Sequence, residues 1–463
     1  MDLLVFFVSP EKRHSFAREK TQVEWGAMSA VHKLTVAELE KPSGTKGRRV
    51  QIATGATLIL LLMFTTCTVF VREAWPAEAF QIGIYALTAT YLLYGIRRGK
   101  EDLAGGLAPW LVYFIPVWGV IQIVAHTTAS TFETREAVLR WGALAAVFFL
   151  TQVVVRSRAD REIALLTYLC FATVMAVLCL IQLFTSEGSV LWVFPSGYKE
   201  VFATFQYHNN YAQFVEISLP IALWWALRDG WRGWGYALAG GVLYASVIGS
   251  ASRSGTVICT AELLAVLAAG LVLRKRQKPG WLFHAATLPL VAVPLLAAIF
   301  TCVVGWQRVW ERFQDRDPYE GRYEFMLSAV DMAEHRPLTG YGLGTFPEVY
   351  QQHAVKDFPV YANHAHNDWA EFAADGGVPF FLLVFLPFAA AVPTALRHPW
   401  GFGLIAVMIH ACFDYPFPRP AVSGWLFAML ALLYIARSSD RLRQRPEEAQ
   451  SSNHSRRVVE FKR

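Results

Sequence analysis

Long apolar blocks separated by short charged loops dominate the chain. Each block has about 20 residues, the length that an α-helix needs to cross the roughly 30 Å hydrocarbon core of a bilayer. The pattern predicts an all-α fold, a polytopic transmembrane helical bundle of about 12 spans. The expected spans lie near residues 51–71, 79–96, 103–125, 138–155, 162–184, 210–227, 233–250, 254–273, 281–305, 377–396, 401–416 and 421–436.

Basic residues mark every second loop between these spans. Arg97 and Arg98 lie in one such loop, Arg156 and Arg158 in the next on that side, and Arg397 in the last. Because cytoplasmic loops carry an excess of Lys and Arg, the alternation predicts that both termini are cytoplasmic.

The spans divide the chain into a bundle and two tails. Residues 1–49 do not resemble a signal peptide and are expected to form a cytoplasmic N-terminal tail. Residues 50–436 make up the bundle, and residues 437–463 a cytoplasmic C-terminal tail. One outer loop, residues 306–376, is large, but it is shorter than a typical independent domain of about 100–150 residues. It is therefore expected to act against the bundle.

Composition supports a membrane protein and excludes other classes. Charged residues make up 17% of the chain, against about 25% in soluble domains. The six cysteines all lie in apolar blocks, so they indicate small core residues rather than a disulfide framework or a metal site. The net charge of +6 comes largely from the termini and short loops, so it does not indicate a nucleic-acid partner.

The large outer loop contains two helical patterns. In residues 322–335, Phe325, Ala329 and Met332 recur at helical spacing, which predicts an amphipathic helix lying on the bundle. A proline and three glycines follow it and predict a tight turn. A second helix is expected to start near His366 and to continue into the span at residue 377.

Two arginines on the outer side are candidate ligands for an anion. Arg253 lies in a minimal turn between two spans, where an arginine is costly unless it is paired or faces a wet cavity. The alternative for Arg253 is an interfacial anchor or an ion pair. Arg322 has the alternative of pairing with Glu320 or Glu324. Converging guanidinium groups would bind a diphosphate.

A polar cluster at residues 363–368 supplies a candidate general base. If the chain is helical from His366, this residue shares a face with Ala370 and lies close to Glu371. An imidazole at the membrane surface suits proton abstraction or the orientation of an attacking hydroxyl. The alternative is a surface histidine that stacks on Trp369.

Metal chemistry is the weaker alternative. His364 and His366 form a His-x-His pair, but a complete zinc site needs three or four ligands, and no further spacing supplies them. Asp315 and Asp317 resemble a paired-aspartate site for a metal and a nucleotide sugar, although a charged loop produces such triplets by chance. No P-loop, dinucleotide motif or nucleophile elbow occurs. We therefore expect neither a metal nor another cofactor.

Four segments, taken in order, carry a family resemblance. They are residues 203–212 (ATFQYHNNYA), residues 252–255 (SRSG), residues 321–346, which begin with Gly-Arg and end with RPLTGYGLGTF, and His366-Asn367 followed after nine residues by Gly377. In this order and in these places relative to the spans, they resemble the O-antigen ligase and polysaccharide-polymerase superfamily of bacterial membrane glycosyltransferases. The chain departs from the pattern at Phe380, where a second glycine is expected, and at Gln206, where asparagine is common. No tryptophan stands between Arg322 and Pro337.

The resemblance implies a location and a reaction. The protein would be a multi-pass protein of the bacterial inner membrane with its active site facing the periplasm. Its donor would be a glycan on undecaprenyl diphosphate, transferred without a metal to a glycan, glycolipid or protein acceptor. Arg253 and Arg322 would bind the diphosphate, and His366 with Arg322 would act in catalysis. Supporting roles are expected for Asn209, Asn210, Asn367 and Glu371.

The acceptor and one other class of function stay open. A ligase, a polysaccharide polymerase and a protein O-oligosaccharyltransferase share this chemistry. A flippase for lipid-linked glycans would instead need charged residues deep within several spans. Glu216, Glu262 and the pair His410 and Asp414 are the candidates for such a path. The pair can equally be a buried, hydrogen-bonded structural pair.

Overall fold

The computed structural model describes residues 45–96, 106–229, 232–275, 321–354 and 361–460, with a few isolated positions between 295 and 314. The N-terminal tail up to residue 44, the span expected at 281–305 and the triplet at 315–317 lie outside the described residues. The chain divides into two units, Met1–Ala53 and Thr54–Arg463.

Helices make up most of the described chain. The helices and strands are α2 (Thr45–Cys67), α3 (Trp75–Ile96), α4 (Leu107–Val124), α5 (Thr131–Val154), α6 (Arg158–Thr185), β1 (Ser189–Val190), β2 (Phe194–Pro195), α7 (His208–Arg228), α8 (Gly233–Gly249), α9 (Arg253–Lys275), α12 (Arg322–His335), α13 (Phe346–Val349), η4 (Tyr350–His353), α14 (Asp368–Arg397), η5 (Pro399–Gly401), α15 (Phe402–His410) and α16 (Pro420–Glu460). Every predicted span except 281–305 overlaps one of these helices. The short antiparallel pair β1–β2 was not predicted.

Seven helices within the described ranges are long and apolar enough to cross a membrane, namely α2, α4, α5, α6, α9, α14 and α16. The chain is therefore a helical, multi-pass membrane protein. Two boundaries differ from the prediction. α15 ends at His410 rather than near residue 416, and α16 continues as a helix to Glu460, well past residue 436.

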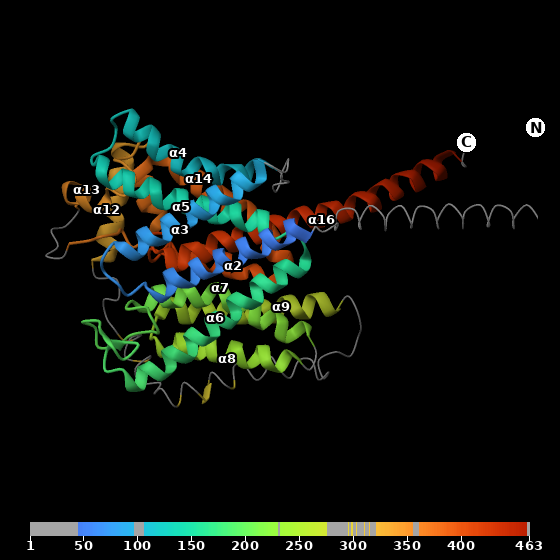
Figure 1. Ribbon diagram of the computed structural model, residues 1–463, viewed down its shortest axis with the longest axis horizontal. Coiled ribbons are helices and arrows are strands. Elements are labelled where there is room, and N and C mark those ends of the chain that lie inside the picture. The colour runs from blue at the N-terminus through green and yellow to red at the C-terminus, as the bar shows by residue number, and fades with distance from the viewer. Residues whose placement is uncertain are drawn as a thin grey trace, which may run out of the picture. The chain divides into compact units, whose positions relative to one another are not determined.

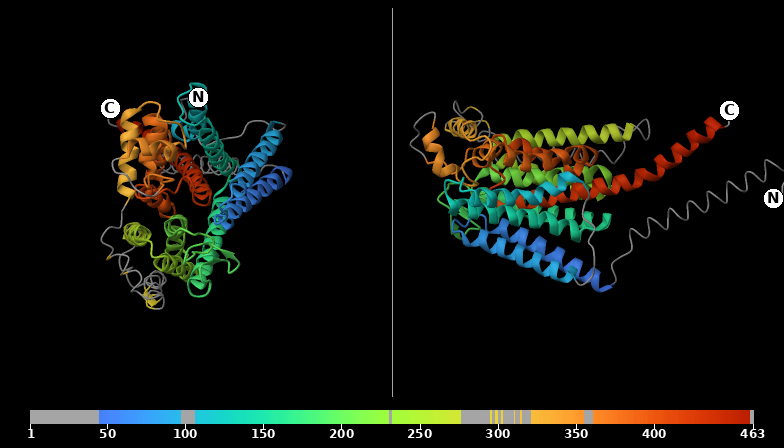
Figure 2. Two further views of the ribbon diagram at one scale, coloured as in Figure 1. Left: turned by 90° about the vertical axis from the view of Figure 1, so that its left-hand side faces the viewer. Right: turned by 90° about the horizontal axis from the view of Figure 1, so that it is seen from above.

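The long helices of residues 54–463 run side by side along one direction (Figures 1 and 2). α12 and α13 lie at one end of these helices, and the C-terminal part of α16 extends from the opposite end (Figure 1). Loops that were predicted to share the outer side meet at the end with α12. Arg72 donates to the Ser196 carbonyl (2.9 Å), and the Ala129 amide donates to the Tyr341 carbonyl (2.6 Å).

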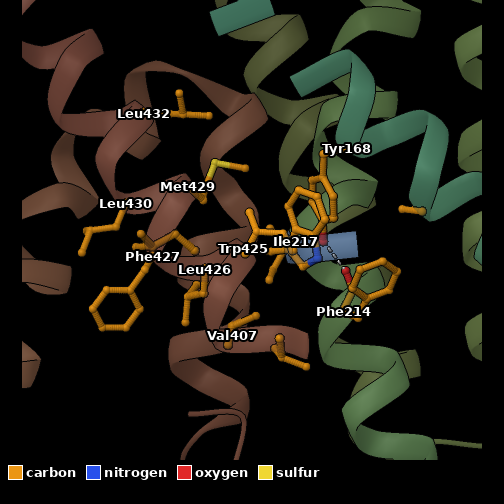
Figure 3. Close-up of a cluster of buried hydrophobic side chains, with 14 of the residues drawn as sticks. Tyr168, Phe214, Ile217, Val407, Trp425, Leu426, Phe427, Met429, Leu430 and Leu432 are labelled. Atoms are coloured by element: carbon orange, nitrogen blue, oxygen red, sulfur yellow. Dashed lines mark hydrogen bonds between the residues drawn. The ribbon is translucent and has the colours of Figure 1, made fainter. Parts of the chain in front are cut away.

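Aromatic side chains lock α6, α7 and α16 together in the core (Figure 3). The Tyr168 ring stacks on Trp425 with centroids 4.3 Å apart, and the Tyr168 hydroxyl donates to the Phe214 carbonyl (2.7 Å). The Trp425 indole N–H donates to the Thr66 hydroxyl (3.0 Å), which adds α2. Such aromatic pairs contribute about 0.5–1.5 kcal/mol beyond the burial of their area. This core supports the ends of α7 and α16 that border the site described below.

The predicted amphipathic helix is confirmed as α12, with Phe325, Ala329 and Met332 buried. The predicted tight turn after it is confirmed as well. Gly340, Gly342 and Gly344 all have positive φ. The Gly344 amide donates to the Asp375 carboxylate (2.7 Å), so the turn docks on α14.

α14 is broken at Gly377, whose φ is 69°. A Cβ at this position would lie 2.7 Å from the backbone of Leu338 and from the Pro337 carbonyl oxygen. The Val378 amide donates to that same carbonyl (2.8 Å). Glycine is required here because a side chain would collide with the chain that follows α12. Phe380, the departure from the family pattern, is buried and packs edge-on against Trp141.

Candidate active site

Asp414 is the centre of a polar network at the end of the bundle that carries α12. Its side chain is 0% exposed and lies in the loop between α15 and α16. Tyr207 donates its hydroxyl to Oδ2 of Asp414 (3.2 Å), and the Asn209 amide donates to the same oxygen. His366 Nδ1 lies 3.7 Å from Oδ1. Three segments that are far apart in the sequence therefore meet at one carboxylate.

The network favours a charged Asp414. Burial alone would raise its pKa, but the nearby imidazole of His366, the charge of His410 and the hydrogen bond from Asn209 together lower the pKa below its usual range. Burial also raises the pKa of Tyr207, so this phenol stays protonated and remains a donor to Asp414.

Arg322 joins the network through Tyr207. It is the first residue of α12, after Gly321 in a left-handed conformation. Its Nη2 donates to the Tyr207 hydroxyl oxygen (2.8 Å). Within the described ranges, Arg322 forms no ion pair with Glu324, whereas Glu320 lies outside them, so the alternative of pairing with Glu320 stays open.

His366 adopts an unexpected conformation. It lies outside α14 in the left-handed region (φ 53°), and the helix begins at Asp368. The expectation that His366 shares a helical face with Ala370 is therefore wrong. Its ring contacts Tyr415 edge-on (4.9 Å) rather than stacking on Trp369. Nδ1 is buried with no hydrogen bond, whereas the side chain is 20% exposed, so the accessible part of the ring lies away from Asp414.

Ser252 ties the turn before α9 to the same network. Its hydroxyl donates to Oδ1 of Asn209 (2.7 Å) and accepts from the Gly255 amide (3.1 Å). Arg253 is the next residue and begins α9, with a half-buried side chain. The backbone of Arg253 is therefore next to Ser252. Ser252 contacts Asn209, and Asn209 contacts Asp414.

The other predicted supporting residues have local contacts. Asn210 donates to Gln213 (3.0 Å). Asn367 caps α14 by accepting from the Ala370 amide (3.1 Å). Glu371 accepts from the Ala365 amide (2.7 Å) and contacts His364 Nδ1 (2.9 Å), so it orders the loop before His366 without touching His366.

Sequence reasoning missed the role of Asp414. It considered Asp414 with His410, but the structure pairs His410 with Glu216 instead (2.7 Å). The signal in the sequence was an acidic residue next to a run of prolines at the end of the span expected at 401–416. Because α15 ends at His410, Asp414 lies in the turn before α16 and not in that span. Tyr207 and Tyr415 carried no comparable signal because aromatic residues are abundant at membrane interfaces.

Of the residues considered for a metal, Asp315 and Asp317 lie outside the described ranges, and the two histidines do not share a carboxylate. His364 contacts Glu371, while His366 faces Asp414, so the two imidazoles are engaged by different carboxylates. In the part of the chain that the structure describes, one group of three possible ligands lies within 4.8 Å, and it consists of Asp331, His335 and His353. It contains neither of the predicted histidines.

The chain is similar to one known family. Residues 238–385 match the family model described as O-antigen ligase. The matched region contains Arg253, Arg322 and His366, whereas Asp414 follows it in the sequence. No curated protein matches the chain. The match, in a multi-pass helical membrane protein, supports membership of this chain in the O-antigen ligase family.

Proposed function

We propose that the protein is a glycosyltransferase that moves a glycan from undecaprenyl diphosphate to an acceptor hydroxyl. The observation that carries the proposal is the network around Asp414, which brings Arg322 and His366 to one place together with Asn209. A cationic ligand for a leaving diphosphate and an imidazole backed by a carboxylate are the two groups that this reaction needs.

The reaction divides between these groups. The acceptor hydroxyl attacks the anomeric carbon of the donor sugar and transfers its proton to His366. Asp414 stabilises the resulting imidazolium, as a carboxylate does beside other catalytic histidines. The bond between the anomeric carbon and the diphosphate oxygen breaks, and undecaprenyl diphosphate leaves with that electron pair.

Arg322, together with Arg253, would bind the diphosphate and offset the charge that develops on it. Tyr207 accepts from Arg322 and donates to Asp414, so it holds the arginine and the carboxylate at a set separation. Loss of one donor to a developing oxyanion costs about 2.7–4 kcal/mol of transition-state stabilisation. Because arginine can satisfy the charge in this way, we propose a reaction without a metal.

The membrane arrangement belongs to the same proposal. Twelve spans, cytoplasmic termini and a site on the periplasmic side of the inner membrane follow from the alternating basic loops. The meeting of the less basic loops at the end with α12 supports this arrangement. The acceptor is a glycan, a glycolipid or a protein, and these correspond to polymerase, ligase and protein O-oligosaccharyltransferase.

A transfer assay tests the proposal. Protein in lipid nanodiscs receives the host's undecaprenyl-diphosphate glycan and a glycan, glycolipid or protein acceptor from the same host, with and without EDTA. Transfer should persist in EDTA and be lost in His366→Ala, Arg322→Ala and Arg322→Lys, since lysine lacks the bidentate fork. Arg336→Ala, at the other end of α12, is the matched control and should stay active. Undiminished transfer by His366→Ala would refute the site, and loss in EDTA alone would refute the metal-free reaction.

One observation favours the flippase as a second candidate. Glu216 and His410 form a fully buried pair within α7 and α15, and both carboxylate oxygens of Glu262 in α9 are buried without a hydrogen-bond partner in the described structure. Charged groups at membrane depth line transport paths in other proteins. Movement of a fluorescent lipid-linked glycan across proteoliposomes, abolished by Glu262→Gln, would favour this function. Transfer without such movement would favour the enzyme.

A further inference from the structure

A polar cavity of about 320 Å³ lies next to the network around Asp414. The charged and titratable side chains that line it are Glu133, Arg140, His364, Glu371, Asp375 and Arg419. We call it the Arg140 cavity. Its volume is at the lower end of the roughly 300–1,000 Å³ that small-ligand sites have. Asn363 at its rim is exposed, so the cavity reaches the surface.

Tyr415 separates the Arg140 cavity from His366. His364, which lines the cavity, stacks on the Tyr415 ring (4.5 Å), and His366 meets the same ring edge-on (4.9 Å). Arg419, also in the lining, lies over that ring (5.4 Å). A group bound against His364 would therefore be connected to the proposed general base through two stacked or edge-on ring contacts, His364 with Tyr415 and Tyr415 with His366.

The lining contains polar side chains whose hydrogen-bonding groups lack partners among the described residues. Arg140 forms no hydrogen bond or ion pair with any described residue, although Glu371 and Asp375 act on its charge. Nε of Arg419 and Oδ1 of Asp375 are buried without a partner among the residues described, and the Asp375 side chain is 5% exposed. Buried donors and acceptors of this kind cost free energy unless water or a ligand pairs with them. The Arg140 guanidinium therefore lies in the lining with donors that no described group accepts.

The charges of the lining indicate what kind of ligand it takes. The two guanidinium groups lie among the acidic side chains of Glu133, Glu371 and Asp375, so the lining has no excess of positive charge to attract a diphosphate. An uncharged ligand that both donates and accepts many hydrogen bonds suits it better. The rings of Trp141 and Phe372 complete the lining and offer an apolar wall. A sugar ring, with hydroxyls at its edge and C–H groups on its face, has this chemistry.

We propose that the Arg140 cavity binds an uncharged sugar residue and holds it beside His366. Arg140 and Arg419 would donate to its hydroxyls, and Asp375 and Glu133 would accept from them. The inference rests on the proposed function, because it assumes that a glycan reacts at His366. The sugar can belong to the donor glycan or to the acceptor, and the experiment separates the two.

Saturation-transfer difference NMR tests the cavity without requiring turnover. The probes are the oligosaccharide released by mild acid from the host's polyprenyl-linked glycan and the lipid-free oligosaccharide of the host's lipopolysaccharide. At least one should receive saturation from the wild-type protein in nanodiscs, and Arg140→Gln should lose most of that signal. Arg135→Gln, an exposed arginine on the same helix, should keep it. Inorganic diphosphate should not compete.

The outcomes separate the two proposals. Equal saturation by wild type, Arg140→Gln and the second variant Glu133→Gln, or no saturation of either probe, would overturn the inference. Competition by diphosphate would overturn it too, because the cavity would then be an anion site. If the proposed function is wrong, the wild-type protein would still bind sugar in the NMR experiment but would show no transfer in the transfer assay. The transfer assay identifies the source of the sugar. In Arg140→Gln, the KM should rise about tenfold for the donor alone or for the acceptor alone, and the substrate affected is the one that carries the sugar. If the KM is unchanged for both substrates, the placement of the sugar beside His366 is wrong.

Discussion

Asp414 shows how one carboxylate can organise a site at the scale of single residues. It is fully buried, accepts from Tyr207 and Asn209, and faces His366. Removing one member of a buried charged network costs about 3–5 kcal/mol because the remaining charge loses its partner. The proposed base and the proposed anion ligand therefore depend on the same carboxylate, one directly and the other through Tyr207.

Asp414→Asn should abolish most of the transfer activity. The amide is close in size to the carboxylate, but it carries no charge to stabilise an imidazolium at His366. The rate of transfer should fall by about 10²–10⁴-fold, the range that general acid–base catalysis contributes. Asp331→Asn, on the partly exposed face of α12, is the control and should leave the rate unchanged. A fully active Asp414→Asn protein would contradict the role given to this carboxylate.

The same residue predicts a pH dependence of stability. A carboxyl whose pKa is lowered by folding adds stability above its unfolded-state pKa, about 3.9 for Asp, and loses that contribution as the pH falls through the lower folded-state value. Folding lowers the pKa of Asp414. The difference in thermal midpoint between wild type and Asp414→Asn should therefore be constant at neutral pH and shrink in strong acid. A difference that grows in acid would contradict the direction of the pKa shift.

At the scale of elements, the break in α14 matters most. Gly377 lets α14 change direction where the Pro337 carbonyl and the Leu338 backbone press against it. The helical part before the break carries Glu371 and Asp375, which hold the loop ahead of His366 and the glycine turn after α12. The part after the break is a membrane-crossing helix. The break thus joins a segment that orders the site to a segment that anchors it.

Gly377→Ala should destabilise the protein. The new Cβ would meet backbone atoms at 2.7 Å, and the residue has a positive φ that alanine adopts at a cost. Strained backbone of this kind costs roughly 1–3 kcal/mol, so the thermal midpoint should fall. Gly235→Ala in α8 is the matched control, because a Cβ there meets nothing within 4 Å. Replacing a helical glycine by alanine is neutral or favourable by up to about 1 kcal/mol. Equal midpoints for the two variants would contradict the steric argument.

The elements show what the sequence can and cannot predict. α12 was predictable because Phe325, Ala329 and Met332 recur within one helix, so their pattern is local. The glycine turn was predictable for the same reason. The left-handed His366 was not, since its conformation depends on the ring of Tyr415 and on Asp414, which lie elsewhere in the sequence. The Arg140 cavity was missed because an arginine among apolar residues of a predicted span gives no sign of what it faces.

At the scale of the whole molecule, the loops that meet at one end of the bundle determine where the proposed active site lies. Loops with few basic residues meet at the end with α12, whereas Arg158, Arg228 and Arg397 stand at the opposite ends of α6, α7 and α14. Packing of aromatic side chains such as Tyr168 and Trp425 holds the helices that support these loops (Figure 3). The residues around Asp414 and those of the Arg140 cavity thus share one end of the bundle.

Labelling with a membrane-impermeant maleimide tests the proposed sidedness. Arg158→Cys places a single thiol at the first residue of α6, and Glu187→Cys places one just beyond its last residue, in a protein whose native cysteines are replaced by serine. In intact spheroplasts, the thiol at 187 should react and the thiol at 158 should react only after permeabilisation. The reverse pattern would place the site in the cytoplasm and remove the support for a periplasmic donor.

The position of Asp414 in the chain also determines when, during synthesis, the network around it can be completed. Its partners Tyr207, Asn209, Arg322 and His366 all precede it. During synthesis, those partners are made first, and the carboxylate arrives only with the turn before α16. A nascent chain therefore holds a positively charged, unfinished site. If the proposed function holds, completion of that turn, rather than insertion of the earlier helices, would mark the step at which the protein can begin to use its substrate.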